Sequence, residues 1–272
     1  MPTTVHEANA AVEALWPLSG ASEWDAPGLI AGDPSAAVSR ILLAVDAVSD
    51  TVDEAIATGA ELMVVHHPLL LRGVTTVAED RYKGALLARL IRSGVGLIAA
   101  HTNADVVEDG TSGTLAALLG LVDVLPIVPG ESPERGLGRV GTLPEPVTLG
   151  RLARRLADLL PATAGGVKAS GDFDQPVRTV ALCGGAGDSL LSHPAVIGAD
   201  VYITSDLRHH PASEVREQAK AIGGPALIDV SHWASEWLWL ESAASRLREE
   251  LPGVAIEVSE LRTDPWDFVV VQ

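Results

Sequence analysis

Basic residues, aromatic residues and cysteine are all scarce in this chain. Its 272 residues include 19 Lys and Arg against 36 Asp and Glu, which gives a formal net charge of −17. A field of this sign repels a phosphate backbone, so we expect no nucleic-acid partner. Only two Tyr and two Phe are present and the six Trp are scattered, so the sequence shows no clear pocket for a nucleobase.

The single cysteine, Cys183, excludes an intrachain disulfide and fits a reducing compartment. Residues 1–18 lack a basic segment followed by an apolar core, so we expect no signal peptide. No apolar run is long enough to cross a bilayer. These absences together predict a cytoplasmic protein without a membrane partner. The hydrophobic fraction of 47% predicts a folded chain with a real core.

Segments with strand and helix character alternate along the chain, which predicts the α/β class. The expected strands cover residues 41–45, 63–65, 95–100, 177–182, 200–204 and 226–230, and the expected helices cover 5–16, 51–57, 82–91, 114–119, 148–160 and a long segment from 232 to 249. Proline and glycine crowd residues 122–146, which indicates a linker or a crossing loop. We therefore expect a first α/β lobe at 1–127, on which residues 250–272 can pack, and a second at 128–249.

The apolar run Met63-Val64-Val65 ends abruptly in His66-His67-Pro68. Ligands bind at the carboxyl ends of such buried strands in open α/β sheets. Neighbouring side chains of an extended chain point in opposite directions, so both imidazoles reach one site only if the chain turns after the strand. Pro68 favours that turn. The alternative is a pair of unrelated histidines at a strand edge.

The order of motifs in the two halves is similar. The segment His66-His67-Pro68 in the first half has a counterpart in His209-His210-Pro211. A later strand in each half ends in a histidine followed four residues on by an acid, His101 and Asp105 in one and His232 and Glu236 in the other. We infer two related α/β units, while chance similarity of alternating α/β chains remains the alternative.

Four imidazoles and two carboxylates follow the ends of the expected strands. This set exceeds the three protein ligands of a typical catalytic zinc ion. It suits a pair of divalent ions, with zinc, iron, nickel or copper favoured over magnesium, and such a pair activates water for hydrolysis. The set consists of His66, His67, His101, Asp105, His232 and Glu236. Taken singly, each residue has a structural alternative, such as a strand-end histidine, a turn acid or a solvated helix pair.

Other polar residues beside expected strands have less specific patterns. His209 and His210, like Asp206, are candidates for acid–base or substrate contacts, or are surface residues. Gly184-Gly185-Ala186-Gly187 follows a strand, so its amides could hold a phosphate. It lacks the lysine and spacing of a P-loop, and a tight turn is the alternative. Cys183 has no partner sequence typical of a nucleophile.

These motifs, in this order, resemble the Nif-three-like family of dinuclear-metal proteins, often labelled type-2 homologues of GTP cyclohydrolase I. The resemblance extends over nearly the whole chain. The motifs that carry it are Trp24-Asp25 with Gly28-Leu29, Val65-His66-His67-Pro68, His101-Thr102-Asn103-Ala104-Asp105, Cys183-Gly184-Gly185-Ala186-Gly187, Asp200-Val201-Tyr202-Ile203-Thr204, and His232 with Glu236.

The resemblance implies two α/β lobes with a metal site in the cleft between them, and a homohexameric toroid in which the chain is its own partner. It implies two divalent ions per chain, zinc, iron or manganese, held by His66, His67, Asp105, His232 and Glu236, with His101 bound directly or through water. This chain departs from the family pattern in having Ser231 where glycine is common and Thr111-Ser112-Gly113 where Gly-Val-Asn is usual. It also lacks the large middle insertion of some members.

The function that we expect from this resemblance is a metal-dependent hydrolase acting on a nucleotide, with GTP opened and formate released. His101, His209 and His210 are the candidate catalytic proton carriers. A phosphoesterase using the same metals is one alternative, and a non-catalytic metal-binding, regulatory or assembly protein is another. A ring that encircles DNA is disfavoured by the net charge of −17.

Overall fold

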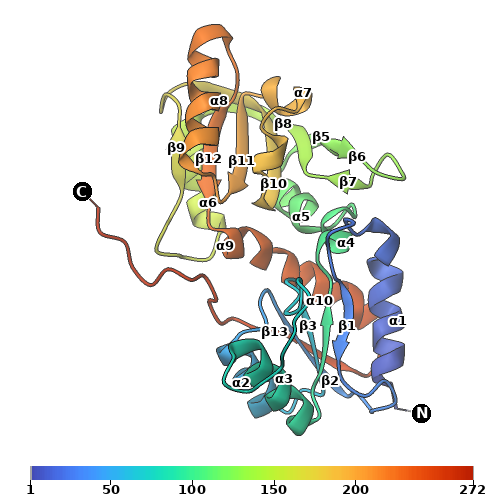
Figure 1. The fold of residues 1–272 in the computed structure, drawn as a ribbon. Coiled ribbons are helices and arrows are strands. Elements are labelled where there is room, and N and C mark those ends of the chain that lie inside the picture. Colours follow the sequence, from blue (N-terminus) through green and yellow to red (C-terminus); the bar gives the residue numbers. More distant parts are fainter. Residues whose placement is uncertain (1, 272) are drawn as a thin grey trace. The chain divides into compact units, whose positions relative to one another are not determined.

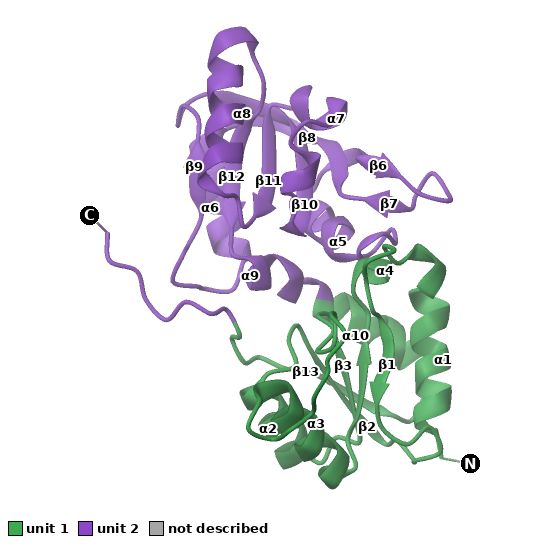
Figure 2. Ribbon diagram, in the orientation of Figure 1, with its two compact units in different colours: residues 1–104, 240–263 green, residues 105–239, 264–272 purple. Residues whose placement is uncertain are grey.

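The chain forms two structural units, each built on its own main β-sheet (Figures 1 and 2). The computed structural model describes residues 2–271. Unit 1 runs to Ala104 and resumes from Leu240 to Thr263, and unit 2 covers Asp105–Trp239 and continues from Asp264.

The first division falls at Ala104 rather than at the expected residue 127. The reason is that helix α5 (Thr111–Leu118) packs on strands β8 and β10 of the unit 2 sheet. The second division falls before Leu240 rather than at the expected residue 249, because nearly all of helix α10 (Trp239–Glu250) belongs to unit 1. Strand β13 (Ala255–Val258), which follows this helix, pairs with β2 (Arg40–Ala44) of unit 1. The boundaries are therefore set by packing of chain segments that the composition does not distinguish.

Unit 1 contains a five-stranded sheet in the order β1-β4-β3-β2-β13, in which only β1 is antiparallel to its neighbour. Its other elements are α1 (Val5–Leu15), η1 (Leu18–Gly20), β1 (Gly28–Ala31), β2 (Arg40–Ala44), α2 (Ser49–Thr58), β3 (Leu62–Val65), α3 (Tyr82–Ser93), β4 (Gly96–Ala99), α4 (Thr102–Asp105) and α10 (Trp239–Glu250), of which α4 and α10 cross the unit boundary at one residue each.

The strands of unit 1 are apolar on both faces because helices cover both. Leu42, Met63 and Leu97 face α2 and α3 in one buried cluster. Helices α1 and α10 also lie against this sheet (Figure 1), and the alternate residues Ile41 and Leu62 are fully buried. This double burial explains why β3 reads as a continuous apolar run up to His66.

Unit 2 contains a six-stranded sheet in the order β5-β8-β10-β11-β12-β9 and a small β6–β7 hairpin. Strands β10, β11 and β12 are parallel, and β5, β8 and β9 are each antiparallel to a neighbour. Besides α5, the elements are β5 (Val122–Leu125), β6 (Val128–Pro129), β7 (Gly136–Leu137), β8 (Arg139–Thr148), α6 (Leu149–Leu159), β9 (Lys168–Ser170), β10 (Pro176–Ala186), η2 (Asp188–Leu190), α7 (Pro194–Ile197), β11 (Val201–Ser205), α8 (His209–Ile222), β12 (Ala226–Val230) and α9 (His232–Trp237).

The two units share a strand pattern. In unit 1 an antiparallel strand, β1, borders the parallel run β4-β3-β2, and in unit 2 an antiparallel strand, β9, borders the parallel run β12-β11-β10. In both units the antiparallel strand precedes the parallel strand that it borders in the sequence. The shared order supports the inferred repeat, and the predicted α/β class is confirmed in each unit.

Two sequence-based predictions were wrong. Residues 122–146 are not a linker but contain β5, the β6–β7 hairpin and most of β8. Pro144 and Pro146 lie in β8 where its pairing with β10 shifts register, and there proline removes no regular ladder bond. The expected helix from 232 to 249 is two helices, because α9 ends at Trp237 and α10 begins at Trp239. No glycine or proline near Leu238 marks the break.

In the part of the chain that the structure describes, no helix has both the length and the apolar character needed to cross a bilayer.

Candidate functional site

Three imidazoles gather at the carboxyl ends of strands β3 and β4 in unit 1. The ring centroids of His66 and His67 are 5.0 Å apart, and those of His66 and His101 are 5.1 Å apart. One ligand nitrogen from each of the three residues lies within 4.8 Å of the other two. The chain bends at His66 and His67, directly after β3, and this bend brings two consecutive side chains to one place.

Each of these imidazoles is oriented by a hydrogen bond from its Nδ1 atom. His66 Nδ1 lies 2.9 Å from the carbonyl oxygen of Ala100, which can only accept. His67 Nδ1 donates to Asp46 Oδ1 at 2.8 Å, and His101 Nδ1 donates to Asp25 Oδ1 at 2.8 Å. With the proton on Nδ1, the lone pair of each ring is on Nε2. Histidines that bind metals are held in this way by oxygen acceptors in the surrounding shell.

Asp25 is the more enclosed of the two carboxylate acceptors, with a fully buried side chain. Its second oxygen accepts from the Thr102 amide at 3.0 Å and from the Thr102 hydroxyl at 2.5 Å. Burial raises the pKa of this carboxyl, but the hydrogen bonds from His101 and Thr102 outweigh it and hold the pKa below its ordinary value. Asp25 therefore stays ionised and fixes both the ring and the tautomer of His101.

His232 and Glu236 form the corresponding pair in unit 2. Ser231 caps α9 by accepting a hydrogen bond from the Ala234 amide, so the helix begins at His232. As the four-residue spacing predicts, the two side chains share one face, and His232 Nε2 lies 2.9 Å from Glu236 Oε1. His232 Nδ1 donates to Asp206 Oδ2 at 2.7 Å. A ring with a carboxylate at each nitrogen suits either a bound proton or a divalent ion in its place.

Asp206 reaches His232 from the end of strand β11. Its φ of 58° lies in the left-handed region, which Asp adopts more readily than most residues. The hydrogen bond from His232 lowers the pKa of the Asp206 carboxyl, against the opposing effect of partial burial. In unit 2, as for His67 and His101 in unit 1, a carboxylate thus accepts a hydrogen bond from the Nδ1 atom of the histidine.

Gly185 provides the space for the His232–Glu236 pair. Its φ is 67°, and a Cβ at this position would lie 2.3 Å from Glu236 Oε1 and 3.1 Å from His232 Nε2. Its amide donates to Ser235 Oγ at 2.9 Å and its carbonyl accepts from Thr204 Oγ1 at 3.0 Å. Glycine is therefore required both by the backbone conformation and by the close approach of the two side chains.

The glycine-rich segment 184–187 is thus the end of strand β10 and a tight turn. The Gly184 amide donates to Ser112 Oγ at 3.1 Å and the Gly185 amide to Ser235 Oγ, so both are engaged within the protein. The interpretation as a phosphate-binding loop is not supported by these two amides. The alternative of a tight turn is right only for the end of the segment, because residues 184–186 belong to strand β10 and Gly187 caps the short helix η2.

Asp105 and Cys183 lie in the same region of unit 2. Asp105 Oδ1 accepts from Thr111 Oγ1 at 2.5 Å, and Thr111 packs against Gly184. Burial raises the pKa of the Cys183 thiol to about 12, and the carboxylates of Asp105 and Glu236 add to this rise. Cys183 therefore stays a thiol, which agrees with its lack of a nucleophile motif. The effect of Asp105 and Glu236 on its pKa shows that both carboxylates are near the end of β10.

His209 and His210 occupy the first turn of α8, and both are exposed. Their ring centroids are 5.1 Å apart. Among residues 2–271, neither belongs to a group of three potential metal-binding side chains. The structure thus gathers His66, His67 and His101 in unit 1 and His232 with Glu236 in unit 2, and it places the second histidine pair on an open helix end.

A family model connects this chain with known proteins. The model described as DUF34/NIF3, for NGG1p interacting factor 3, matches residues 3–265. The chain belongs to the DUF34/NIF3 family. A Streptomyces coelicolor relative, named GTP cyclohydrolase 1 type 2 homolog, is 49% identical over 267 residues, which cover 96% of this chain and 92% of the relative.

A solved structure of a Staphylococcus aureus hypothetical protein matches with a TM-score of 0.89 and 26% identity, covering 99% of this chain and all of that one. A Mycobacterium leprae relative, also named GTP cyclohydrolase 1 type 2 homolog, is 35% identical and covers 93% of this chain and 92% of its own length. That alignment spans 361 positions, so the relative carries inserted sequence that this 272-residue DUF34/NIF3 chain lacks.

Sequence reasoning did not assign the acceptors that orient the imidazoles. Asp46 closes strand β2 and Asp25 follows Trp24, and neither has a spacing that points to a histidine. Asp46 lies 21 residues from His67, and Asp25 lies 76 residues from His101. The only signal was that Asp25 belongs to a motif shared with the family.

We expect the variant Asp25→Asn to bind metal 10- to 100-fold more weakly than the wild type, because the amide cannot hold the His101 tautomer as a carboxylate does. Isothermal titration of the metal-free protein with zinc measures the affinity. Asp33→Asn is the control, since Asp33 is an exposed acid whose carboxylate accepts from the neighbouring Ser35. Equal zinc affinity of Asp25→Asn and the wild type would show that Asp25 has only a structural role.

Proposed function

We propose that this DUF34/NIF3 protein binds a pair of divalent metal ions and hydrolyses a nucleotide. The observation that carries the proposal is the cluster of His66, His67 and His101, whose ligand atoms lie within 4.8 Å of one another while each Nδ1 atom is held by an oxygen acceptor. A proton on Nδ1 puts the lone pair of all three rings on Nε2, which is one of the two imidazole atoms that bind metals. This donor set fits a transition metal.

Unit 2 supplies the other proposed ligands. Glu236 is buried and lies against His232, and Asp105 adds a second carboxylate to this unit. A mixture of imidazole and carboxylate donors favours zinc, iron or manganese over calcium or magnesium. We propose that His66, His67, His101, Asp105, His232 and Glu236 together hold the two ions.

Two divalent ions held by such donors lower the pKa of water and neutralise negative charge that develops in the transition state. The protein's own residues would orient the substrate and move protons. We propose this proton-carrying role for His101, His209 and His210. Where a water molecule rather than His101 itself binds the ion, the Asp25 carboxylate would stabilise a protonated His101, and the exposure of His209 and His210 leaves their rings accessible to a substrate.

The choice of a nucleotide substrate is supported by the names of the relatives, which are called homologues of a GTP cyclohydrolase. The bond that is broken is decided by the product. Formate indicates opening of the purine ring, and inorganic phosphate indicates a phosphoesterase.

The test is a turnover assay on protein loaded separately with zinc, manganese or ferrous iron. GTP and a panel of other nucleotides are the substrates, and formate and phosphate are measured. We expect turnover by the wild type, a loss of at least 100-fold in Asp105→Asn, and unchanged turnover in Asp33→Asn. The proposal fails if metal-loaded wild-type protein turns over none of the nucleotides, and the metal would then have a non-catalytic role.

A further inference from the structure

The segment Trp266–Val271, termed the apolar arm, is exposed along its whole length. Trp266 is 68% exposed, Phe268 80% and Val271 88%, and the segment has neither helix nor strand structure. Single exposed apolar residues are ordinary, but a contiguous apolar segment of this kind marks an interaction surface. The exposure of the arm therefore indicates that it binds an apolar surface.

The arm starts from a fixed point in unit 2. Asp264 Oδ2 accepts from Ser231 Oγ at 2.5 Å, and Asp264 Oδ1 accepts from the Trp266 amide at 3.1 Å. Ser231 is the same residue that caps α9. These bonds hold the base of the arm, while its side chains remain open to solvent.

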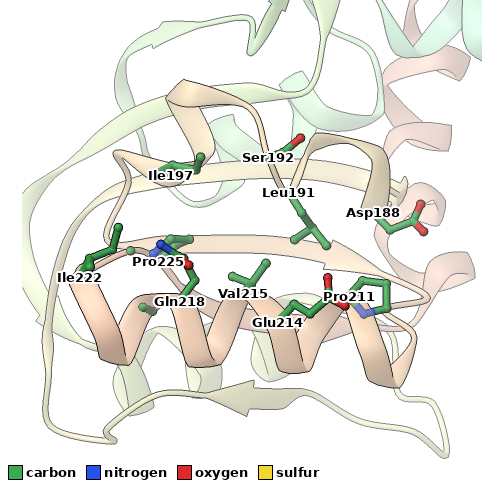
Figure 3. Close-up of a pocket in the computed structure, with 13 residues that line it drawn as sticks. Asp188, Leu191, Ser192, Ile197, Pro211, Glu214, Val215, Gln218, Ile222 and Pro225 are labelled. Carbon is green, nitrogen blue, oxygen red and sulfur yellow. The ribbon is translucent and has the colours of Figure 1, made fainter.

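Unit 2 has a groove with an apolar lining that could bind such side chains (Figure 3). It lies between α8 and the segment containing η2 and α7, with a volume of about 550 Å³. Leu191, Ile197, Val215 and Ile222 form its apolar lining, and Glu214 and Gln218 provide polar atoms. Ile197 is 51% exposed and Ile222 79%. A groove of this size accepts large aromatic side chains, and Glu214 or Gln218 can accept from an indole N–H.

A smaller hollow of about 290 Å³ adjoins the groove. The two share Ala219, Gly224 and Pro225, which form a ridge between them. The hollow is lined by Arg216 and Lys220 from α8 and by Asp172, and Lys220 also donates to Glu217 Oε1 at 2.6 Å. The ridge therefore separates the apolar groove from a polar hollow that holds two basic side chains and one acid.

At its start, the side chains of the arm alternate between apolar and acidic in a way that fits the groove and the hollow on the two sides of the ridge. Along an extended chain, Trp266 and Phe268 project to one side and Asp267 to the other. We propose that the arm of one copy of this chain binds along the ridge of a second copy, with Trp266 and Phe268 in the groove and Asp267 beside Arg216 and Lys220. Each copy carries both an arm and a groove, so a pair of copies related by a two-fold axis would form two identical arm–groove contacts.

The first test is sedimentation velocity of the full chain over a range of concentrations. The variants are the double change Trp266→Ser with Phe268→Ser in the arm and Ile222→Asp in the groove. We expect each to weaken self-association at least tenfold. Tyr82→Ser is the matched control, because Tyr82 is an aromatic residue of unit 1 that is 67% exposed, and it should associate as the wild type does. All substituted residues are exposed, so circular dichroism should show unchanged folding.

A charge reversal tests the orientation of the arm. Asp267→Lys and Arg216→Glu should each weaken the association, and the two changes combined in one chain should restore it. Cross-linking gives a direct readout, since Cys183 is buried and cysteines introduced at 268 and 222 are the reactive ones. Mixing a Phe268→Cys chain with an Ile222→Cys chain should give a disulfide between the two copies.

The proposal is overturned if the wild type is monomeric at every concentration, or if the arm and groove variants assemble as the wild type does. It is also overturned if only Val124→Asp dissociates the protein, because Val124 belongs to the exposed edge strand β5. A chain carrying both new cysteines that closes its disulfide within a monomer would equally overturn it, since the arm would then cover its own groove.

Discussion

The double variant His66→Ala, His232→Ala is expected to purify without bound metal, whereas the wild type should hold about two divalent ions per chain. His66 is fully buried and its Nδ1 proton bonds to the carbonyl oxygen of Ala100, so Nε2 is the atom that we expect to coordinate an ion. The partner of His232 at Nε2 is a carboxylate that is itself buried. Removing one imidazole from each unit leaves too few protein ligands to hold the ions stably.

Elemental analysis of protein purified without chelator measures the metal content. The single variants His66→Ala and His232→Ala show how much each set contributes. His6→Ala is the matched control, because His6 is an exposed histidine on helix α1. A double variant that retains two ions per chain, or a wild type that takes up none on incubation, contradicts the proposed metal site.

Replacement of Gly185 by alanine should destabilise the metal-free protein by about 2–4 kcal/mol and weaken metal binding at least tenfold. The left-handed backbone accounts for about 1 kcal/mol of this loss. The rest follows because the new Cβ would lie 2.3 Å from Glu236 Oε1, and Glu236 is buried and cannot move away without disturbing its neighbours.

Gly59→Ala separates the two contributions. Gly59 has a similar φ of 70°, but a Cβ there meets nothing within 4 Å. Urea unfolding of both variants in the presence of chelator should give a loss of about 1 kcal/mol for Gly59→Ala and a clearly larger loss for Gly185→Ala. Equal losses, together with unchanged metal affinity, would show that the close approach to Glu236 has no energetic consequence.

Much of the fold could be predicted because local patterns agree with the tertiary structure. Helix α1 was expected at residues 5–16 and occupies Val5–Leu15, with Thr4 and Glu7 bonded as a capping box. Helix α2 ends where Gly59 adopts a left-handed conformation. Apolar runs gave the buried parallel strands correctly, because helices cover both faces of these strands.

Local patterns failed where pairing between distant segments decides the structure. Strand β8 contains prolines that normally argue against a strand, and only its pairing with β5 and β10 makes it one. The assignment of Leu240–Thr263 to unit 1 depends on β13 pairing with β2, across more than half of the chain. No periodicity in either segment reports these partners.

The sequence by itself determined which side chains are available as ligands and which face they occupy. The shared face of His232 and Glu236 follows from helix geometry alone. His66 and His67 were recognisable as a pair at a strand end, but strand geometry points them in opposite directions, and they meet only because the chain bends after β3. Only the tertiary structure decided how these side chains are held. Asp25, Asp46 and Asp206 reach the histidines from other strands and loops, and Gly185 makes room for Glu236 from strand β10, because folding brings together residues whose separation along the chain carries no signal.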